Sequence, residues 1–380
     1  MISDFQRVKD VSSIADVAVE SKVRNVGQFV TEVRSVTSSQ SLVRTSEYFE
    51  NSRTSADTSG YKVVEPGMFA YNPSRINIGS IATSTENEPV IVSPMYVVFS
   101  IDQGKVLPAF LMHQLTSSRM SAKIDTNTEV GARFRLPFSR LGQIEIYTPP
   151  IAEQRQIVEI LDSFIGLQLE LEAELEARKK QYELYRDQLL TFAERAEVRW
   201  VPMGEVVENL DSRRRPVTRS ERESGAYPYY GANGVQDFVS DFIFDGTFLL
   251  MGEDGSVIQK NGTPVLNWAS GKIWVNNHAH VLKEKPDVVR LRFLYFYLQT
   301  VDISSYVTGG TQLKLNQGNL NRINVPIPPD SEQERIVEIL DKFDALVNDI
   351  SIGLPAEIKA RRKQYEYYRD KLLTFPEAAA

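Results

Sequence analysis

A charged segment that follows a proline pair occurs twice in this chain of 380 residues, and this duplication constrains the fold more than any other feature. Residues 153–164, EQRQIVEILDSF, recur as EQERIVEILDKF at 332–343, with nine of twelve positions identical. Residues 177–192, ARKKQYELYRDQLLTF, recur at 360–375 with thirteen of sixteen identical. Since such a repeat reproduces whole structural units, we expect two copies of one globular block, each followed by one helical segment.

The globular blocks match each other more faintly, but in the same order. LGQIEIYTPP at 141–150 parallels LNRINVPIPP at 320–329, and GARFRL at 131–136 parallels GTQLKL at 310–315. We therefore expect a first block over residues 1–150, a helix over 151–195, a second block over 196–330 and a second helix over 331–376. A duplicated chain can fold with approximate two-fold symmetry, which suits a ligand with two similar halves.

Apolar residues follow alternating spacings of four and three in both helical segments, which is typical of helices that pack along a seam. In the first copy these are Ile157, Leu161, Phe164, Leu171, Leu175, Tyr182, Tyr185 and Leu189. The second copy keeps the spacing at Ile336, Leu340, Phe343, Val347, Ile350, Leu354, Ile358, Tyr365, Tyr368 and Leu372. It carries a four-residue insertion around Gly353 and Pro355, where proline lacks an N–H and clashes one turn back. The first helix is therefore expected to be continuous and the second to be kinked near 353–355.

Each helical segment begins after a proline pair, and Ser331 with Glu334 fits a capping box at the second start. We expect the two helices to pair antiparallel, because an isolated apolar seam needs a partner. At 1.5 Å per residue, roughly 40 residues make a rod of about 60 Å. Such rods would hold the two globular blocks apart.

Composition excludes several classes of protein. The chain has no cysteine, so disulfide frameworks, thiolate metal sites and cysteine nucleophiles are excluded. The first residues, MISDFQRVKD, contain no apolar signal region and no stretch approaches eighteen apolar residues, so we expect a soluble, cytoplasmic protein. The net charge of −7 comes mainly from the helical segments, while residues 1–150 carry 15 basic and 15 acidic side chains and residues 196–330 carry 14 and 15. Each block is therefore free to present a basic face.

Several long strings, together with the repeated helices, resemble one known family over essentially the full chain. They are YNPSRINIGSIA at 71–82, YPYYGANGVQDFV at 227–239, GEDGSV at 252–257 and SGKIWVNNHAHVL at 270–282. The chain resembles the specificity subunit of type I restriction-modification systems. The resemblance implies two α/β or α+β target-recognition domains separated by an antiparallel two-helix coiled coil, each domain binding one half of a bipartite site in double-stranded DNA.

The same resemblance implies the partners. Two methyltransferase subunits would dock on the helices, and restriction or translocase subunits would join them in a phage-defence complex. S-adenosylmethionine, ATP and Mg would be bound by those subunits, with no cofactor on this chain. Docking candidates are the basic clusters Arg178, Lys179 and Lys180 on the first helix and Arg361, Arg362 and Lys363 on the second.

No catalytic constellation is found in the sequence. An adenine methyltransferase needs an Asn/Asp-Pro-Pro-aromatic motif, and the nearest string is Asn72-Pro73-Ser74; Gly271-Lys272 lacks the upstream glycine of a phosphate-binding loop. His278 and His280 lie two apart on an expected strand, so they would share a face and could bind a metal, pack in the core or contact DNA. We predict a non-catalytic protein without a metal site.

Candidate DNA contacts are basic, amide and aromatic side chains in clusters, turns and glycine-led stretches, where arginine and lysine suit phosphates and asparagine or glutamine suits base edges. In the first block they are Tyr71, Asn72, Arg75, Asn77, Arg133 and Arg135. In the second they are Arg213, Arg214, Arg215, Lys272, Asn276, Asn277, His278, Gln312 and Lys314, with the last two alternating onto one face of a strand. A structural role in a turn, loop or core remains the alternative for each, and Tyr227, Tyr229 and Tyr230 are interpreted as core.

Three other functions stay open. The chain could serve a methylation-only or other phage-defence methyltransferase that has no restriction subunit. It could be a coiled-coil scaffold that does not bind DNA, or a self-contained DNA-modifying enzyme. The missing motifs speak against the last of these.

Overall fold

The computed structural model describes residues 11–37, 41–45, 55, 57–128, 134–192 and 198–374, so Arg133 lies outside the described residues. The chain divides into two compact units. Unit 1 comprises Met1–Glu172 with Ile358–Ala380, and unit 2 comprises Ala173–Glu357. Each unit therefore combines one globular block with parts of both helical segments. Along the described parts of the chain, we find no helix with the length and apolar character needed to cross a membrane.

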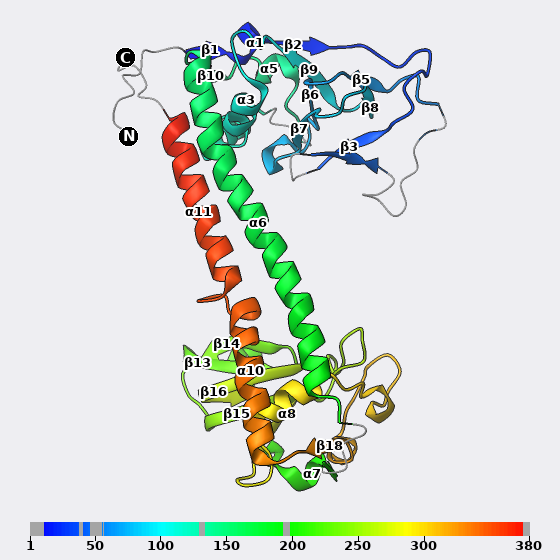
Figure 1. Ribbon diagram of the computed structural model, residues 1–380, viewed down its shortest axis with the longest axis vertical. Coiled ribbons are helices and arrows are strands. Elements are labelled where there is room, and N and C mark those ends of the chain that lie inside the picture. Colours follow the sequence, from blue (N-terminus) through cyan, green and yellow to red (C-terminus); the bar gives the residue numbers. More distant parts are fainter. Residues whose placement is uncertain are drawn as a thin grey trace. The chain divides into compact units, whose positions relative to one another are not determined.

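Unit 1 is built from short strands and helices (Figure 1). Its strands are β1 Val11–Ser13, β2 Ala18–Ser21, β3 Arg34–Val36, β4 Leu42–Arg44, β5 Lys62–Val64, β6 Phe69–Tyr71, β7 Ile81–Thr83, β8 Val90–Val92, β9 Val97–Ile101 and β10 Glu145–Tyr147. Its helical elements are α1 Ile14–Val17, η1 Ile76–Ile78, α3 Pro108–Leu115, α4 Ser118–Asn127 and α5 Phe138–Leu141. The central strands β6 and β9 are rich in aromatic and β-branched residues and are mostly buried, as a sheet core requires.

Unit 2 contains the second block and two of the helical pieces. Its strands are β11 Arg199–Pro202, β12 Val207–Asn209, β13 Ser224–Gly231, β14 Gly234–Val239, β15 Phe244–Gly252, β16 Leu266–Val275, β17 Ala279–Glu284 and β18 Asn324–Ile327. Its helical elements within the block are α7 Met203–Val206, η2 Asp211–Arg213, η3 Arg219–Glu221, α8 Leu291–Leu298, η4 Ser304–Tyr306 and α9 Gln317–Asn321.

The two blocks share one sheet topology, which is the structural form of the duplication. Unit 1 has a four-stranded sheet in the order β2-β9-β6-β7, and unit 2 has β12-β17-β15-β16 in the corresponding places. A two-stranded pair also recurs, as β1-β10 and β11-β18. The blocks differ in what is added: unit 2 extends its sheet with β13 and β14, whereas unit 1 carries the separate pairs β3-β4 and β5-β8. The two blocks therefore differ in the strands that are added to the shared sheet.

The first helical segment is one continuous helix, and the second is broken, as expected from Pro355. Helix α6 runs over Ile151–Leu189, while the second copy forms α10 Asp330–Asn348 and α11 Leu354–Leu373. Pro355 is the second residue of α11, where its missing N–H leaves no helical hydrogen bond unmade. Gly353 lies in the break between the two helices. A side chain does not fit at this position, because a Cβ would come within 2.3 Å of the Ala345 carbonyl oxygen.

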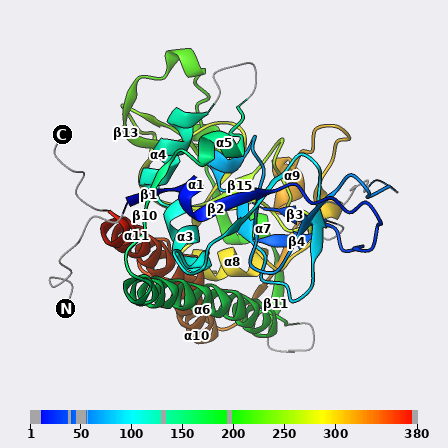
Figure 2. The same cartoon turned by 90° about the horizontal axis from the view of Figure 1, so that it is seen from above.

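Within each unit, α6 packs against part of the second helical segment, as Figures 1 and 2 show. In unit 1, Ile157 and Leu161 near the start of α6 share a core with Leu372 near the end of α11, and the Phe164 and Tyr368 rings stack 5.4 Å apart. The two helices are therefore antiparallel there. In unit 2, the ring of Phe343 on α10 lies 5.5 Å from Tyr185 and 6.4 Å from Tyr182 of α6.

The repeated glutamine of the EQ motif ties each helix to its block. Gln154 and Gln333 are buried, and each accepts a hydrogen bond of 2.8 Å from the backbone N–H of a residue just before α3 or α8. Their amide groups donate to the carbonyl oxygens of Pro149 at 2.7 Å and Pro328 at 3.0 Å. A buried amide that is fully paired fixes the helix start against the block, because leaving any of these groups unpaired would cost about 1–3 kcal/mol.

The repeated aspartate of the ILD motif makes a second attachment. Asp162 is 3.0 Å from Nε2 of His113 on α3, and Asp341 accepts a 2.6 Å hydrogen bond from Nε of Arg292 on α8. Burial lowers the pKa of His113 below its ordinary value although Asp162 opposes the shift. Arg292 also packs over the Phe296 ring at 4.5 Å. The motif thus fulfils the same role in both units with different partners.

The capping box expected at Ser331 and Glu334 is not formed. The N-cap of α10 is Pro329, which has no side-chain hydrogen bond to offer, so Ser331 lies inside the helix. Glu334 instead lies 3.5 Å from the guanidinium of Arg290. The proline pair sets the helix start two residues earlier than the box would, because its fixed φ already suits the position before a helix.

Tyr182 and Tyr365 occupy equivalent positions of the repeat but have different surroundings. The Tyr365 hydroxyl lies 3.2 Å from Nδ1 of His113. The Tyr182 hydroxyl is buried and has no hydrogen-bond partner among the described residues. His113 and Phe296 hold the same position in the equivalent helices α3 and α8. The Phe296 side chain has no polar atom that could pair with a hydroxyl.

We therefore predict opposite effects for two identical substitutions. Tyr365→Phe should destabilise unit 1 by about 1 kcal/mol, because it removes a partly buried hydrogen bond to the buried His113. Tyr182→Phe should leave unit 2 unchanged or stabilise it, because it removes a buried hydroxyl that has lost water without gaining a partner. Hydrogen exchange of peptides from α11 reports on unit 1, and exchange of peptides from α10 reports on unit 2. Equal losses of protection in the two variants would contradict this account.

Candidate nucleic-acid interface

The segment after β12 carries the arginine cluster of the second block. The backbone N–H of Arg215 donates to the carbonyl oxygen of Val275 at 3.3 Å, and the Arg215 carbonyl accepts from the indole of Trp274 at 2.6 Å. These bonds hold the segment against the end of β16. Arg213 and Arg215 consequently point to solvent, whereas Arg214 points inward.

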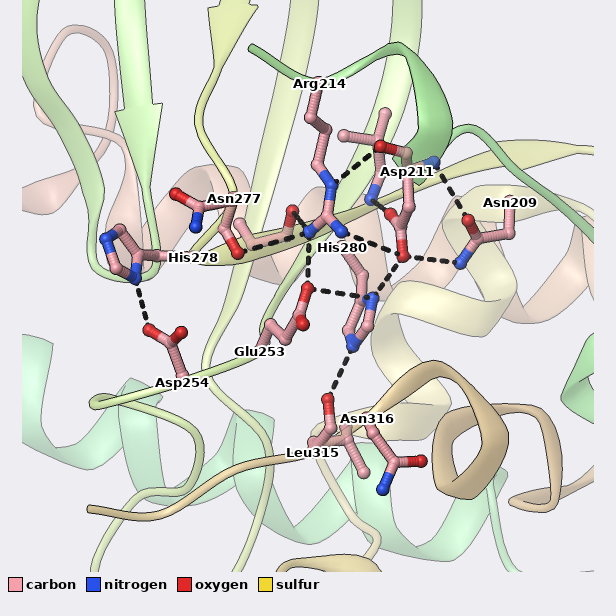
Figure 3. A network of polar contacts seen from close by, with 12 residues as sticks. Asn209, Asp211, Arg214, Glu253, Asp254, Asn277, His278, His280, Leu315 and Asn316 are labelled. Atoms are coloured by element: carbon pink, nitrogen blue, oxygen red, sulfur yellow. Dashed lines mark hydrogen bonds and ion pairs between the residues drawn. The ribbon is translucent and has the colours of Figure 1, made fainter. Parts of the chain in front are cut away.

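Arg214 is the centre of a buried charge network (Figure 3). Its guanidinium lies 2.5 Å from the Glu253 carboxylate and 3.5 Å from the Asp211 carboxylate, and donates to the Ala279 carbonyl at 2.8 Å. Its side chain is only 13% exposed. Charges removed from water are tolerated because they are paired and hydrogen-bonded. We therefore correct the expected role of Arg214 from a DNA contact to an interior ion pair of unit 2.

His280 completes this network and is fully buried. Its Nε2 donates to the Leu315 carbonyl at 2.7 Å, and its Nδ1 lies 2.5 Å from the Asp211 carboxylate. Burial by itself would raise the pKa of Asp211, but hydrogen bonds from His280 and the Val281 N–H, with the charge of Arg214, lower that pKa overall. The ionised Asp211 thus joins η2, β17 and the loop that ends at Leu315.

The two histidines do not share a face, so that interpretation of the sequence was wrong. Strand β17 begins only at Ala279, and His278 lies before it in a turn where the Asn276 side chain accepts from the His278 N–H at 2.8 Å. Nδ1 of His278 contacts the carboxylate of Asp254, whereas His280 points into the core. Asn276 is buried by this turn, which corrects its expected role in base contact to a structural one.

Asp211, Glu253 and His280 have the composition of a small metal site, with ligand atoms within 4.8 Å of one another. Arg214 nevertheless already supplies the positive charge between the two carboxylates. Both ring nitrogens of His280 are also engaged, with Asp211 and with a backbone carbonyl. We therefore assign a structural role to this group and no metal.

Above the network lies an exposed rim that we call the unit 2 rim, formed by Asn277, His278, Gln312 and Lys314. The Asn277 carbonyl accepts from Arg214 at 3.4 Å, which supports the turn from below. The Lys314 ammonium lies 3.7 Å from Glu253, and the Lys314 backbone bridges Asp254, the partner of His278. The network therefore brings amide, imidazole and ammonium groups from two distant parts of the sequence to one region.

The stretch around Gln312 and Lys314 is a loop and not the strand that the sequence suggested. Thr308 and Lys314 exchange backbone hydrogen bonds of 2.8 and 2.7 Å, which closes the loop on itself. The Gln312 and Lys314 side chains are exposed, as expected. Their exposure comes from their place in this loop, and not from the alternation of side chains along a strand.

Two further basic candidates of unit 2 lie against aromatic rings. Lys272 on β16 is exposed, with its ammonium 4.6 Å from the centre of the Phe242 ring. The Arg213 guanidinium lies 5.0 Å from the centre of the Phe244 ring and donates to a backbone carbonyl at 3.2 Å. Such contacts orient a cation without burying it. Of the tyrosines interpreted as core, Tyr229 is buried.

In unit 1 the structure separates the candidates of the YNPSR string into two groups. Tyr71 is fully buried and its hydroxyl donates to the Leu136 carbonyl at 3.0 Å; burial raises its pKa well above the usual range. Asn72 is buried as well, and its side chain accepts from the Ser74 N–H at 3.0 Å. Both are therefore corrected from expected DNA contacts to structural residues that shape the turn.

The exposed candidates of unit 1 are Arg75, Asn77 and Arg135. Within the described residues, the side chains of Arg75 and Asn77 make no hydrogen bond or ion pair with the chain. The Leu136 N–H donates to the Pro73 carbonyl at 2.9 Å, which places the segment of Arg135 beside the turn of Arg75. The structure thus joins two candidates that are far apart in the sequence.

Sequence reasoning missed Asp211, Glu253 and Asp254, because it selected the site candidates among basic, amide, imidazole and aromatic side chains. These acidic residues hold the basic and amide groups in place. The acidic pair inside the GEDGSV string was a usable signal, since carboxylates that lie inside a fold need cationic partners.

We predict that substitutions of the neighbouring residues Arg214 and Arg215 have different effects on the stability of unit 2. Arg214→Ala should destabilise unit 2 by about 3–5 kcal/mol, because Asp211 and Glu253 would lose the buried guanidinium between them. Arg215→Ala should leave stability within about 0.5 kcal/mol, because its side chain is exposed. Thermal unfolding of the two variants measures this difference, with Arg213→Ala as a second exposed control, and a stable Arg214→Ala protein would disprove the network's role.

Comparison with known proteins gives consistent matches along the chain. The family model described as the type I restriction modification DNA specificity domain matches residues 31–179 and 197–360. The type I restriction enzyme EcoR124I/EcoR124II specificity subunit of Escherichia coli is 32% identical over 309 residues, covering 75% of this chain and 75% of that protein. A Haemophilus influenzae protein provisionally named as a type I restriction enzyme specificity subunit is 43% identical over 188 residues, and the match spans 48% of both chains.

Solved structures share the fold. A structure from work on complex assembly and conformational transition of the type I R-M system has a TM-score of 0.63 and 17% identity, over 96% of this chain and 97% of that one. The S subunit of a type I restriction-modification system from M. genitalium has a TM-score of 0.58 and 16% identity, over 99% of both. These structures show the fold alone. The family model that matches both blocks, together with the relative that is 32% identical over 75% of each chain, establishes that the chain belongs to the type I restriction-modification DNA specificity domain family.

Proposed function

We propose that this chain is the DNA-recognition subunit of a type I restriction-modification complex and binds a bipartite target, with one block contacting each half-site. The observation that carries the proposal is the recurrence of one sheet topology in two units, each completed by a pair of helices. A protein with two similar binding blocks suits a ligand with two similar binding sites along one axis, and duplex DNA is such a ligand. The chain itself is not an enzyme in this proposal.

The exposed polar groups of each block support contact with DNA. Unit 1 presents Arg75, Asn77 and Arg135, and unit 2 presents the unit 2 rim with Arg213, Arg215 and Lys272. Guanidinium and ammonium groups bind phosphates, while asparagine and glutamine amides match the edge of adenine in the major groove. We propose that these residues make the contacts and that the two sets differ because each half-site has its own sequence.

We further propose that the helices dock two methyltransferase subunits, which restriction or translocase subunits then join. The basic clusters on the helices are held by pairs on their own helix: Lys179 lies 3.1 Å from Glu176, and Arg362 lies 3.4 Å from Glu366. Exposed pairs of this kind contribute little to stability, so exchanging them for pairs with a partner costs little. Arg178 and Arg361 each contact a glutamine of their own helix, while Lys180 and Lys363 are exposed.

The chemistry of the complex belongs to the partner subunits in this proposal. The methyltransferase subunits would bind S-adenosylmethionine and flip an adenine in each half-site, and the translocase subunits would use ATP and Mg. This chain would contribute the positions of the two half-sites. A methylation-only or other phage-defence system would use the same surfaces, and a scaffold without a role in DNA binding is the remaining alternative.

The direct test is to co-express the chain with a candidate methyltransferase gene from the same genome and to map methylated adenines by long-read sequencing. A split target with a fixed gap is expected. Exchange of residues 196–330 for the corresponding block of a relative should change one half of the target only. Uniform methylation without a split motif, or no methylation with the methyltransferase correctly folded, would reject the proposal.

The spacing of the half-sites should follow the length of the helices. Residues 171–178 repeat a tetrapeptide, LEAE and then LEAR, and the boundary between the two units falls inside this stretch. An added tetrapeptide advances a helix by about 6 Å and turns it by about 40°. One base pair advances DNA by about 3.4 Å and turns it by about 35°.

We therefore predict that inserting Leu-Glu-Ala-Glu after Glu174 lengthens the unspecified spacer of the target by one base pair, or by two. Deleting residues 171–174 should shorten it, and Glu172→Ala, which keeps the length, should leave it unchanged. Methylation sequencing measures all three variants. An unchanged target in the insertion variant would show that the helices do not set the spacing.

A further inference from the structure

A turn of unit 1 presents a group of apolar side chains to solvent. Strand β2 leads into residues 22–30, where the Val23, Val26 and Phe29 side chains are 59%, 77% and 92% exposed. Single exposed apolar residues are ordinary, but three within seven positions, one of them a fully displayed aromatic ring, are not explained by packing inside the unit.

This turn has an ordered backbone. The Asn25 side chain is buried and makes two hydrogen bonds with Val30, donating to its carbonyl at 2.8 Å and accepting from its N–H at 3.2 Å. The Gln28 N–H donates to the Asn25 carbonyl at 2.8 Å, and Gln28 adopts a φ of 53°, which is unfavourable for a residue with a side chain. The Phe29 ring lies over Gly27, where a Cβ would come within 2.0 Å of it. The turn is therefore shaped to hold the ring outward.

Positive charge surrounds the turn. Burial lowers the pKa of Lys62, and the nearby charges of Arg24, Lys22 and Arg135 lower it further, while Glu20 opposes them. The chain at Arg24 forms a backbone bridge with Lys62. The four cations, which we call the Lys62 patch, thus lie near one another. Arg135 belongs to the patch and is also a candidate DNA contact, so the apolar turn and that candidate share one neighbourhood.

The corresponding connection of unit 2 is basic too. Strands β2 and β12 hold the same place in the two four-stranded sheets. The chain leaves β2 into the exposed residues Lys22 and Arg24, and leaves β12 into a segment that carries the exposed residues Arg213 and Arg215. Two blocks that differ in most loops therefore keep positive charge in the same connection. Attraction to one common polyanion explains this better than attraction to two different protein surfaces.

We propose that Val26 and Phe29 act as an apolar wedge that inserts at a base step in or beside the half-site bound by unit 1, with the Lys62 patch contacting the flanking phosphates. The inference rests on the proposed function and deepens it. Proteins that bend DNA use apolar side chains in this way, and they unstack one step while cations hold the backbone on either side. Val23 remains at the base of the wedge. The wedge adds affinity without distinguishing bases by hydrogen bonds.

The test uses the chain in complex with the methyltransferase subunits of the co-expression experiment, and a set of duplexes that carry the mapped bipartite target. Thymine is placed in turn at each step in and around the first half-site, and permanganate detects unstacked thymines. The wild-type complex is expected to give one reactive step that the double variant Val26→Ser, Phe29→Ser loses. A thymine opposite a flipped adenine should react in both proteins and serves as an internal signal.

The affinity of the double variant for the duplex should fall about 10-fold, as for loss of one stacked aromatic ring. Its dependence on salt concentration should stay unchanged, because no phosphate contact is removed. Lys22→Ala with Arg24→Ala should instead reduce the salt dependence. Val11→Ser is the matched control, since Val11 is exposed in the same unit but lies on β1, and it should behave as wild type.

Two results would overturn the wedge alone: unchanged permanganate reactivity and affinity in the double variant, or loss of the methyltransferase subunits with unchanged DNA binding by the chain that remains. The second result would make the turn a protein-binding surface. All three variants replace exposed side chains, so their melting temperatures should equal that of wild type. If the wild-type complex fails to bind the bipartite duplex, the proposed function fails together with the wedge.

Discussion

Packing of the apolar helical seam against a globular block is the interaction on which both units depend. Neither block is completed by its own helical segment alone, because unit 1 uses the start of α6 with α11 and unit 2 uses the end of α6 with α10. The buried glutamines and the repeated aspartates fix each helix to its block through hydrogen bonds that water cannot replace. The duplication therefore yields two structural units that share a continuous helix, and not two domains in succession.

The common frame permits the two blocks to differ where they meet a ligand. In unit 2, a buried network of Arg214, Asp211, Glu253 and His280 holds the turn of Asn277 and the loop of Lys314 in register. In unit 1, the buried Tyr71 hydroxyl and the turn at Asn72 hold the segments that carry Arg75 and Arg135. Different buried contacts on one sheet topology give two surfaces of different chemistry, as the proposed binding of two unlike half-sites would require.

The exposure of the site candidates separates the side chains that a ligand can reach from those that it cannot. Arg75, Asn77, Arg215 and Lys314 are exposed as a contact residue must be. Tyr71, Asn276 and Arg214 have the same kinds of side chain, yet they lie inside the fold. Residue type does not separate these groups, because a buried arginine and a phosphate-binding arginine meet the same need for a negative partner.

The sequence alone determined the duplication, the continuous first helix and the break near Pro355, because these follow from identity, periodicity and the missing N–H of proline. It also determined the family, through strings long enough to be specific. Only the tertiary structure decided which half of each helix completes which block, and which charged groups face inward. Those outcomes depend on contacts between residues more than a hundred positions apart, such as His113 with Tyr365, and no local pattern records which distant partner satisfies a buried polar group.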